Sequence, residues 1–173
     1  MRTHYCGEIN ESLIDQEVTV CGWAHRRRDH GGVIFIDLRD RYGLTQVTFD
    51  PDANKEAWKI ADKLRGEWVI LVKGKVIERP RDMVNKKMAT GEIEVEISEI
   101  EILNESKTPP FEIGDEKSKE ANENLRLKYR FVDLRRDKLQ KIIKNRNEVI
   151  RYIREYFHKN SFITFKLTVI RLT

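Results

Sequence analysis

The segment HRRRDHGGVIFIDLRDRYGLTQVTFDP, residues 25–51, decides how the N-terminal half of the chain folds. Within it, residues 33–40 (VIFIDLRD) and 44–50 (LTQVTFD) alternate apolar and polar side chains with the period of two that is typical of β-strands. Only the turn Arg41-Tyr42-Gly43 separates them. So short a connection predicts two antiparallel neighbours.

The alternation also assigns the two faces of this hairpin. The side chains expected to point inward, toward a core, are those of Ile34, Ile36, Leu38, Val47 and Phe49. Phe35 and Gln46 then lie together on the outer face. Three arginines, Arg26 to Arg28, occupy what we expect to be the adjoining loop.

Four further segments complete the pattern. Strands are expected at 17–25, 67–78 and 92–104, and an amphipathic helix is expected at 53–65. The alternation in the last strand slips by one residue after Ser98, which is typical of a β-bulge. The order β-β-β-α-β-β predicts a mainly β fold, a five-stranded Greek-key barrel of the OB type, over residues 1–104.

The chain beyond the barrel has a different character. Residues 105–125 are mostly polar and contain Pro109-Pro110, so we expect a linker there. A long amphipathic helix follows, from Asp137, its expected N-cap, to Lys159. Its apolar stripe consists of Leu139, Ile142, Ile143, Val149, Ile150, Ile153 and Phe157. Because the core of the barrel is complete without this stripe, the stripe points to a further domain or a partner.

Charge is spread unevenly over a chain whose formal net charge is +4. Residues 92–123 hold eleven acidic and three basic side chains, a local net charge of −8. Residues 126–154 hold eleven basic and three acidic side chains, a local net charge of +8. The asymmetry indicates either two functional surfaces or two solvated faces of opposite sign.

Cysteine content and hydropathy place the protein in a reducing compartment. Two cysteines in 173 residues do not make a disulfide framework. No run of 18 apolar residues occurs, and the first ten residues are too polar for a secretory signal. We therefore expect a cytoplasmic protein with no membrane partner.

The outer face of the hairpin suggests a binding site for single-stranded RNA. A ring at Phe35 can stack on an unpaired base, and the amide of Gln46 can both donate to and accept from a base edge. The neighbouring arginines can hold phosphates. The alternatives are that Phe35 is one of the many isolated exposed apolar residues of soluble proteins, and that the arginines form an ordinary solvated loop.

The segments CGWAHRRRDHGGVIFIDLRD, GLTQVTFDPD, MATGEIEVE and RLKYRFVDLRR resemble the N-terminal part of bacterial aspartyl-tRNA synthetase over roughly residues 1–162. The resemblance implies an anticodon-binding OB domain joined to a class II catalytic domain. It further implies an ATP- and Mg²⁺-dependent enzyme that acts as a homodimer and charges tRNA-Asp, in some members also tRNA-Asn. His30, in the loop that bears on this choice, leans toward the second type.

The same resemblance implies roles for individual residues in reading the anticodon G-U-C. By its matching positions, Phe35 would stack on a base and Gln46 would read the middle U. Arg26 and Arg28 would contact the anticodon loop, and Glu94 would contact the first base.

The resemblance weakens where motif 1 of the class II domain should end in Glu-Thr-Pro. Residues 126–162 match the beginning of that domain, but the chain continues as SFITFKLTVIRLT (161–173), so we expect residues 163–173 to be an aberrant tail. Motifs 2 and 3 are absent from these 173 residues. We therefore expect no catalytic residue and no aminoacylation by this chain alone, and tRNA binding at most.

Other functions receive less support from the residues. His4, Cys6, Cys21 and His25 could gather around zinc, but their spacing is loose, and structural cysteines are the favoured interpretation. No Gly-rich phosphate loop is present. A free-standing OB module that binds single-stranded RNA, or a non-functional gene remnant, stays as the alternative function.

Overall fold

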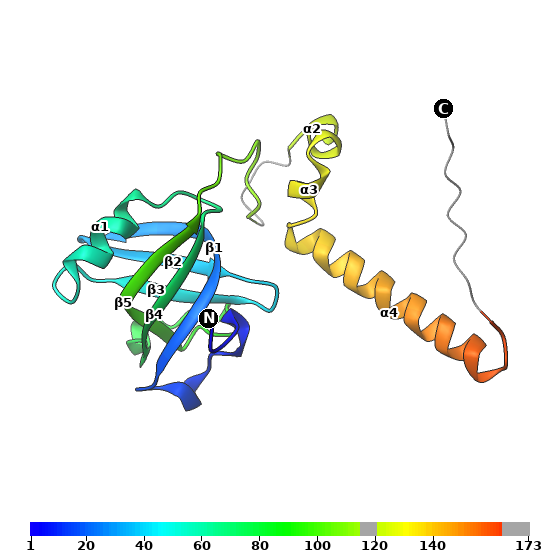
Figure 1. The fold of residues 1–173 in the computed structure, drawn as a ribbon, viewed down its shortest axis with the longest axis horizontal. Helices are drawn as coiled ribbons and strands as arrows, with labels where there is room; N and C mark the ends of the chain where they lie inside the picture. Colours follow the sequence, from blue (N-terminus) through cyan, green and yellow to red (C-terminus); the bar gives the residue numbers. More distant parts are fainter. Residues whose placement is uncertain (115–120, 164–173) are drawn as a thin grey trace. The chain divides into compact units, whose positions relative to one another are not determined.

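The computed structural model describes residues 1–114 and 121–163. It divides into two compact units, Met1–Pro109 and Pro110–Thr173, which are described separately. The first unit is the expected barrel and the second contains the expected long helix (Figure 1).

Five strands of the first unit close into a barrel with the spatial order β1-β2-β3-β5-β4 (Figure 1). Their bounds are Glu17–His30 (β1), Val33–Arg39 (β2), Leu44–Phe49 (β3), Val69–Glu78 (β4) and Ile93–Asn104 (β5). β3 and β5 run parallel, and the other neighbouring pairs, including β1 and β4, are antiparallel. The OB-type barrel predicted from the element order is confirmed.

The interior of the barrel holds the predicted core residues. Ile34, Ile36, Leu38 and Val47 are fully buried, and Phe49 is nearly so. Helix α1, Lys55–Lys63, lies between β3 and β4 in the chain and contributes Ala57 and Ala61 to the core cluster. Leu64, just after the helix, belongs to the same cluster. Asn54 caps this helix by accepting hydrogen bonds from two backbone N–H groups.

The predicted β-bulge is present in β5. Lys73 pairs with Glu99 and Gly74 with Ile97, which leaves Ser98 as the extra residue. The Ser98 hydroxyl donates to the Lys73 carbonyl at 3.1 Å. A Cβ added to Gly74 would lie 2.1 Å from the carbonyl oxygen of Glu96, so glycine permits the close approach of the two backbones.

Strand β1 is longer than expected, and this corrects the place of the arginines. It runs to His30, so that Arg26, Arg27 and Arg28 belong to a strand and not to a loop. The reason is the turn Gly31-Gly32, whose φ angles of 62° and 91° suit the two-residue hairpin connection of type I′. Because that turn is so tight, pairing between β1 and β2 continues up to His30 opposite Val33.

The second unit contains three helices, α2 (Glu123–Lys128), α3 (Arg130–Asp133) and α4 (Asp137–Lys159). Asp133 is fully buried, and its carboxylate lies 3.0, 2.8 and 3.6 Å from Arg126, Arg130 and Arg136. The prediction that Asp137 is the N-cap is wrong: Arg136 occupies that position and α4 begins at Asp137 itself. None of the described helices is long and apolar enough to cross a membrane.

The apolar stripe of α4 lies open along most of its length. Ile142, Val149, Ile153 and Phe157 are between 38% and 57% exposed. The segment 163–173, expected to be an aberrant tail, falls outside the described residues from residue 164 onward.

We expect Gly74→Ala to lower the free energy of unfolding by about 1–3 kcal/mol, because the new Cβ forces the backbones of β4 and β5 apart. Gly66→Ala is the matched control, since a Cβ there meets nothing within 4 Å. Urea unfolding of both variants measures the difference. A loss for Gly74→Ala no larger than that for Gly66→Ala would contradict the role assigned to Gly74.

Candidate nucleic-acid interface

The outer face of β2 and β3 brings the predicted site residues together. Gln46 pairs with Asp37 across the hairpin, and Phe35 pairs with Thr48. Because neighbours along a strand alternate between faces, Phe35, Asp37 and Gln46 share the outer face of the barrel. The predicted juxtaposition of Phe35 and Gln46 follows from this register.

Phe35 and Gln46 differ in their exposure. Phe35 is partly exposed, and the ring of His30 approaches it edge-on with centroids 6.1 Å apart. Gln46, expected to be wet, is only 8% exposed. It lies on the outer face, but charged side chains from β1 and β5 surround its amide.

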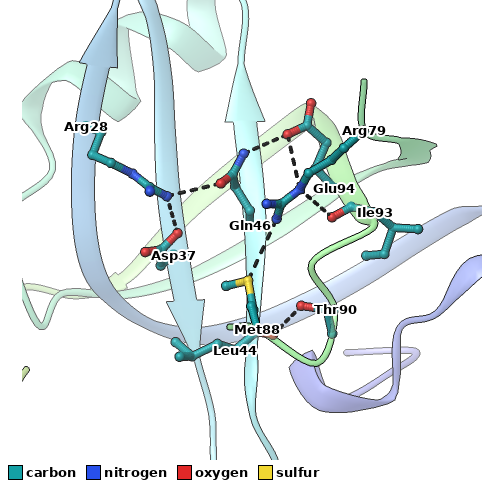
Figure 2. A network of polar contacts seen from close by, with 9 residues as sticks. All are labelled: Arg28, Asp37, Leu44, Gln46, Arg79, Met88, Thr90, Ile93 and Glu94. Atoms are coloured by element: carbon teal, nitrogen blue, oxygen red, sulfur yellow. Dashed lines mark hydrogen bonds and ion pairs between the residues drawn. The ribbon is translucent and has the colours of Figure 1, made fainter. Parts of the chain in front are cut away.

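A continuous chain of polar contacts passes through Gln46 (Figure 2). On one side, the Gln46 Oε1 atom accepts from Arg28 at 3.1 Å, and Arg28 also donates to Asp37. On the other side, Gln46 Nε2 donates to Glu94 Oε2 at 2.7 Å. The Arg79 guanidinium lies 3.8 Å beyond, forming an ion pair with Glu94. Five residues from β1, β2, β3, β5 and the end of β4 thus form one network.

The network is largely withdrawn from water. Burial raises the pKa of the Asp37 carboxyl in spite of the opposing charge of Arg28. Burial likewise lowers the pKa of the Arg79 guanidinium, with Glu94 acting in the opposite direction. Arg79 is held further by donating to the Ile93 carbonyl at 2.9 Å and to the Met88 sulfur at 3.8 Å. The amide of Gln46 is therefore presented by a largely desolvated frame in which both of its polar atoms have a charged partner.

The three arginines of β1 divide between two tasks. Arg28 lies opposite Phe35, and Arg26 lies opposite Asp37, so both reach the outer face of the hairpin. Arg27 is different, since it forms a 2.7 Å ion pair with Asp62 in α1. Helix α1 also contacts the hairpin tip through Trp58, whose indole N–H donates to the Gly32 carbonyl at 2.6 Å. Arg27 and Trp58 thus tie the hairpin of β1 and β2 to helix α1. Arg26 and Arg28 lie on the outer face that carries the predicted site.

Asp37 and Arg79 were not among the predicted site residues. Asp37 alternates with the inward-pointing Ile36 and Leu38, and its position opposite Gln46 follows once the register of β2 and β3 is known. The sequence pattern gives no such indication for Arg79, which follows β4 and is distant in sequence from β2 and β3. The antiparallel pairing of β4 with β5, which sets Glu78 opposite Ile93, brings Arg79 to Glu94.

Two alternatives from the sequence can be compared with the structure. Among residues 1–114 and 121–163, no group of three or more His, Cys, Asp or Glu side chains could hold a metal ion. Cys6 is buried, and burial raises the pKa of its thiol. His25 contacts Arg39 at 2.7 Å and not a thiol cluster.

A second buried charge cluster lies next to the interface, at Arg39 of β2. Arg39 Nη2 donates to Glu67 Oε2 at 2.7 Å, and His25 Nδ1 lies 3.7 Å from Glu67 Oε1. Burial raises the pKa of the Glu67 carboxyl, but His25 and Arg39 outweigh it, and the net pKa lies below the ordinary value. This cluster joins β1, β2 and the segment before β4.

The comparisons with known proteins follow this geometry. Residues 18–103 match a family model described as an OB-fold nucleic acid binding domain. Residues 122–170 match the class II tRNA synthetases of the D, K and N group. The aspartate–tRNA(Asp/Asn) ligase of Desulfatibacillum aliphaticivorans is 53% identical over 169 residues, which are 98% of this chain. The chain belongs to the aspartate–tRNA ligase family.

Other relatives of this family agree with the assignment. The aspartate–tRNA ligase of Staphylococcus saprophyticus is 51% identical over 98% of the chain. The chain spans 28% and 29% of the length of these two relatives. Asparaginyl-tRNA synthetase from Pyrococcus horikoshii superposes with a TM-score of 0.76 and 26% identity over 91% of this chain and 34% of that protein. The barrel is thus the anticodon-binding OB domain of this family, and residues 122–170 belong to its class II synthetase region.

The Glu67 cluster predicts a dependence of stability on pH. Glu67→Gln keeps the shape of the side chain but removes its charge, so we expect a loss of about 1–3 kcal/mol in unfolding free energy at neutral pH. Because the folded pKa of Glu67 lies below the unfolded one, its contribution is fully present above roughly pH 4.3 and is lost as the pH falls through the folded value.

Urea titrations at about pH 7, pH 4 and pH 3 measure this difference, which should shrink with acidity. Glu56→Gln, at an exposed position of α1, is the control and should change stability by less than about 0.5 kcal/mol. A constant difference at all three pH values would contradict the role assigned to the charge of Glu67.

Proposed function

We propose that the outer face of β2 and β3 binds the anticodon loop of tRNA-Asp. The observation that carries the proposal is the placement of a partly exposed ring, Phe35, beside an amide, Gln46, whose polar partners are fixed. Phe35 stacks on an unpaired base, and Gln46 reads the edge of the middle base, U, of the anticodon G-U-C.

Three charged residues complete the proposed site. Arg26 and Arg28 lie on the same face of the hairpin as Phe35 and contact the anticodon loop. Glu94 contacts the first base, G, using carboxylate lone pairs that its bond to Gln46 leaves over.

The free thiols of Cys6 and Cys21 suit the reducing cytoplasm, where we place the protein.

The complete enzyme, by its family, transfers aspartate to tRNA-Asp through an aspartyl-adenylate made with ATP and Mg²⁺. We assign no residue of this chain to ATP or Mg²⁺. The chain's own contribution is tRNA binding.

The range of tRNA acceptors is a second part of the proposal. One of the relatives is named for both tRNA-Asp and tRNA-Asn, and another is an aspartate–tRNA ligase without that addition. His30 lies edge-on to Phe35, the proposed stacking ring, which supports its influence on this choice. We infer that His30 bears on whether tRNA-Asn is accepted beside tRNA-Asp.

Titration of the protein with a labelled G-U-C anticodon stem-loop tests the site. Phe35→Ala should weaken binding by about 1–3 kcal/mol through lost stacking. Gln46→Ala should reduce the preference for U at the middle position more than it reduces overall affinity. Tyr42→Ala, which removes an exposed ring from the β2–β3 turn, is the matched control and should have little effect.

Preference for the G-U-C anticodon separates this proposal from a general basic surface, whereas salt dependence tests the phosphate contacts that both would make. Binding should weaken as salt rises, because phosphate contacts release counterions. Equal affinity for every anticodon would reduce the barrel to a general single-strand binder, and no binding of the G-U-C stem-loop would overturn the proposed function.

We also infer that self-association, which the resemblance implies as a homodimer for the full-length family, depends on the exposed apolar stripe of α4. Ile153→Asp should weaken self-association at least about tenfold, because a charge enters an apolar contact. Lys144→Asp, on the polar side of the same helix, is the control. Sedimentation velocity over a range of concentrations measures both, and equal self-association of the two variants would contradict the assignment of this face.

A further inference from the structure

We propose that the two charged neighbours of Gln46 hold its amide in one direction, and that this direction makes the interface select uracil over cytosine at the middle position. The inference rests on the proposed function and deepens it. It assigns positioning roles to Asp37 and Arg79, which act on the amide through Arg28 and Glu94.

Only one direction of the amide satisfies both neighbours. Arg28 carries donors alone, and an ionised Glu94 carries acceptors alone. Gln46 therefore turns its carbonyl oxygen to Arg28, at 3.1 Å, and its NH₂ group to Glu94, at 2.7 Å. Rotating the amide by 180° would set NH₂ against the guanidinium and oxygen against the carboxylate. At a side chain only 8% exposed, water cannot relieve two such contacts.

The two neighbours are themselves held in place. Arg28 is tied to Asp37, which lies opposite Gln46 in the hairpin. Glu94 is 3.8 Å from Arg79, a residue only 4% exposed and anchored to the Ile93 carbonyl. The charges alternate along the network in the order negative, positive, amide, negative, positive (Figure 2). Asp37 neutralises Arg28, and Arg79 neutralises Glu94. Arg28 and Glu94 therefore keep their contacts with Gln46 while their charges are paired.

The fixed amide still has capacity for a base. Its oxygen retains one lone pair, and its nitrogen retains one hydrogen. Uracil offers an N3–H donor between two carbonyl acceptors, so N3–H can donate to the amide oxygen while a carbonyl accepts from the NH₂ group. Cytosine has a lone pair at N3, which would face the amide oxygen. With the amide reversed, cytosine would fit and uracil would not.

Stacking on Phe35 restricts how the base can shift along the amide of Gln46. Cytosine could match the same amide only by sliding one position along its edge, so that its N4–H donates to the amide oxygen and its N3 accepts from the NH₂ group. Phe35 projects from the same face, and the proposal assigns to stacking on this ring the role of holding the base against that slide. The discrimination between two pyrimidines of similar size therefore depends on the direction of the amide together with the position of the stacked base.

The experiment compares Glu94→Gln with Glu96→Gln in the complete chain. Both variants remove one carboxylate from β5, two residues apart on the same face, but only Glu94 contacts Gln46. The dissociation constants are measured for anticodon stem-loops with G-U-C and with G-C-C. In Glu94→Gln the ratio of the two constants should fall by about tenfold, as expected when a hydrogen bond no longer fixes the amide. In Glu96→Gln the ratio should stay as in the unaltered protein.

A second variant, Asp37→Asn, removes the charge that holds Arg28 and leaves the Gln46 contacts themselves intact. The U-over-C ratio should fall in the same direction but less than in Glu94→Gln. Thermal unfolding of each variant is measured beside the binding, so that a loss of fold is recognised by a lower unfolding temperature and not by the binding data.

The outcomes separate this inference from the proposed function. If the unaltered protein does not bind the G-U-C stem-loop, the proposed function fails, and the inference fails with it. If the unaltered protein prefers U and folded Glu94→Gln prefers it equally, the proposed function stands and the inference is overturned. Equal changes in Glu94→Gln and Glu96→Gln would show an effect of net charge alone, which also overturns the inference.

Discussion

The register of the hairpin between β2 and β3 is the constraint on which the interface depends. Asp37 pairs with Gln46, and Phe35 pairs with Thr48. A slip of one residue would turn Phe35 and Gln46 into the barrel and Ile36 and Val47 out of it. Burial of Ile34, Ile36 and Leu38 therefore stabilises the arrangement of the polar face as well as the core, because the same alternation sets both.

The interface then shows how the protein pairs charged side chains that are partly withdrawn from water. Each charged member of the network around Gln46 has an oppositely charged or polar neighbour within contact distance. The Glu67 cluster solves the same problem beside it, with Arg39 and His25 around one carboxylate. Pairing of this kind limits the motion of the side chains and presents them rigidly to a ligand.

The second unit also pairs a buried charge with side chains of opposite charge. Three arginines surround the buried carboxylate of Asp133, and this cluster joins α2, α3 and the start of α4. Helix α4 then extends with its apolar stripe exposed. The chain spans less than a third of the length of its relatives, and the stripe is the part of it that most clearly calls for a partner surface.

The sequence by itself determined the barrel, its strand order, the bulge at Ser98 and the shared face of Phe35 and Gln46. Each of these depends on alternation or turn chemistry between residues close in the chain. It misplaced the arginines, because the φ angles of Gly31 and Gly32 that extend β1 were not inferred from the pattern. Only the tertiary structure decided that Gln46 is covered and joined to Glu94 and, through Glu94, to Arg79. Those contacts link strands that are far apart in sequence, and no local periodicity encodes which side chains meet when a barrel closes.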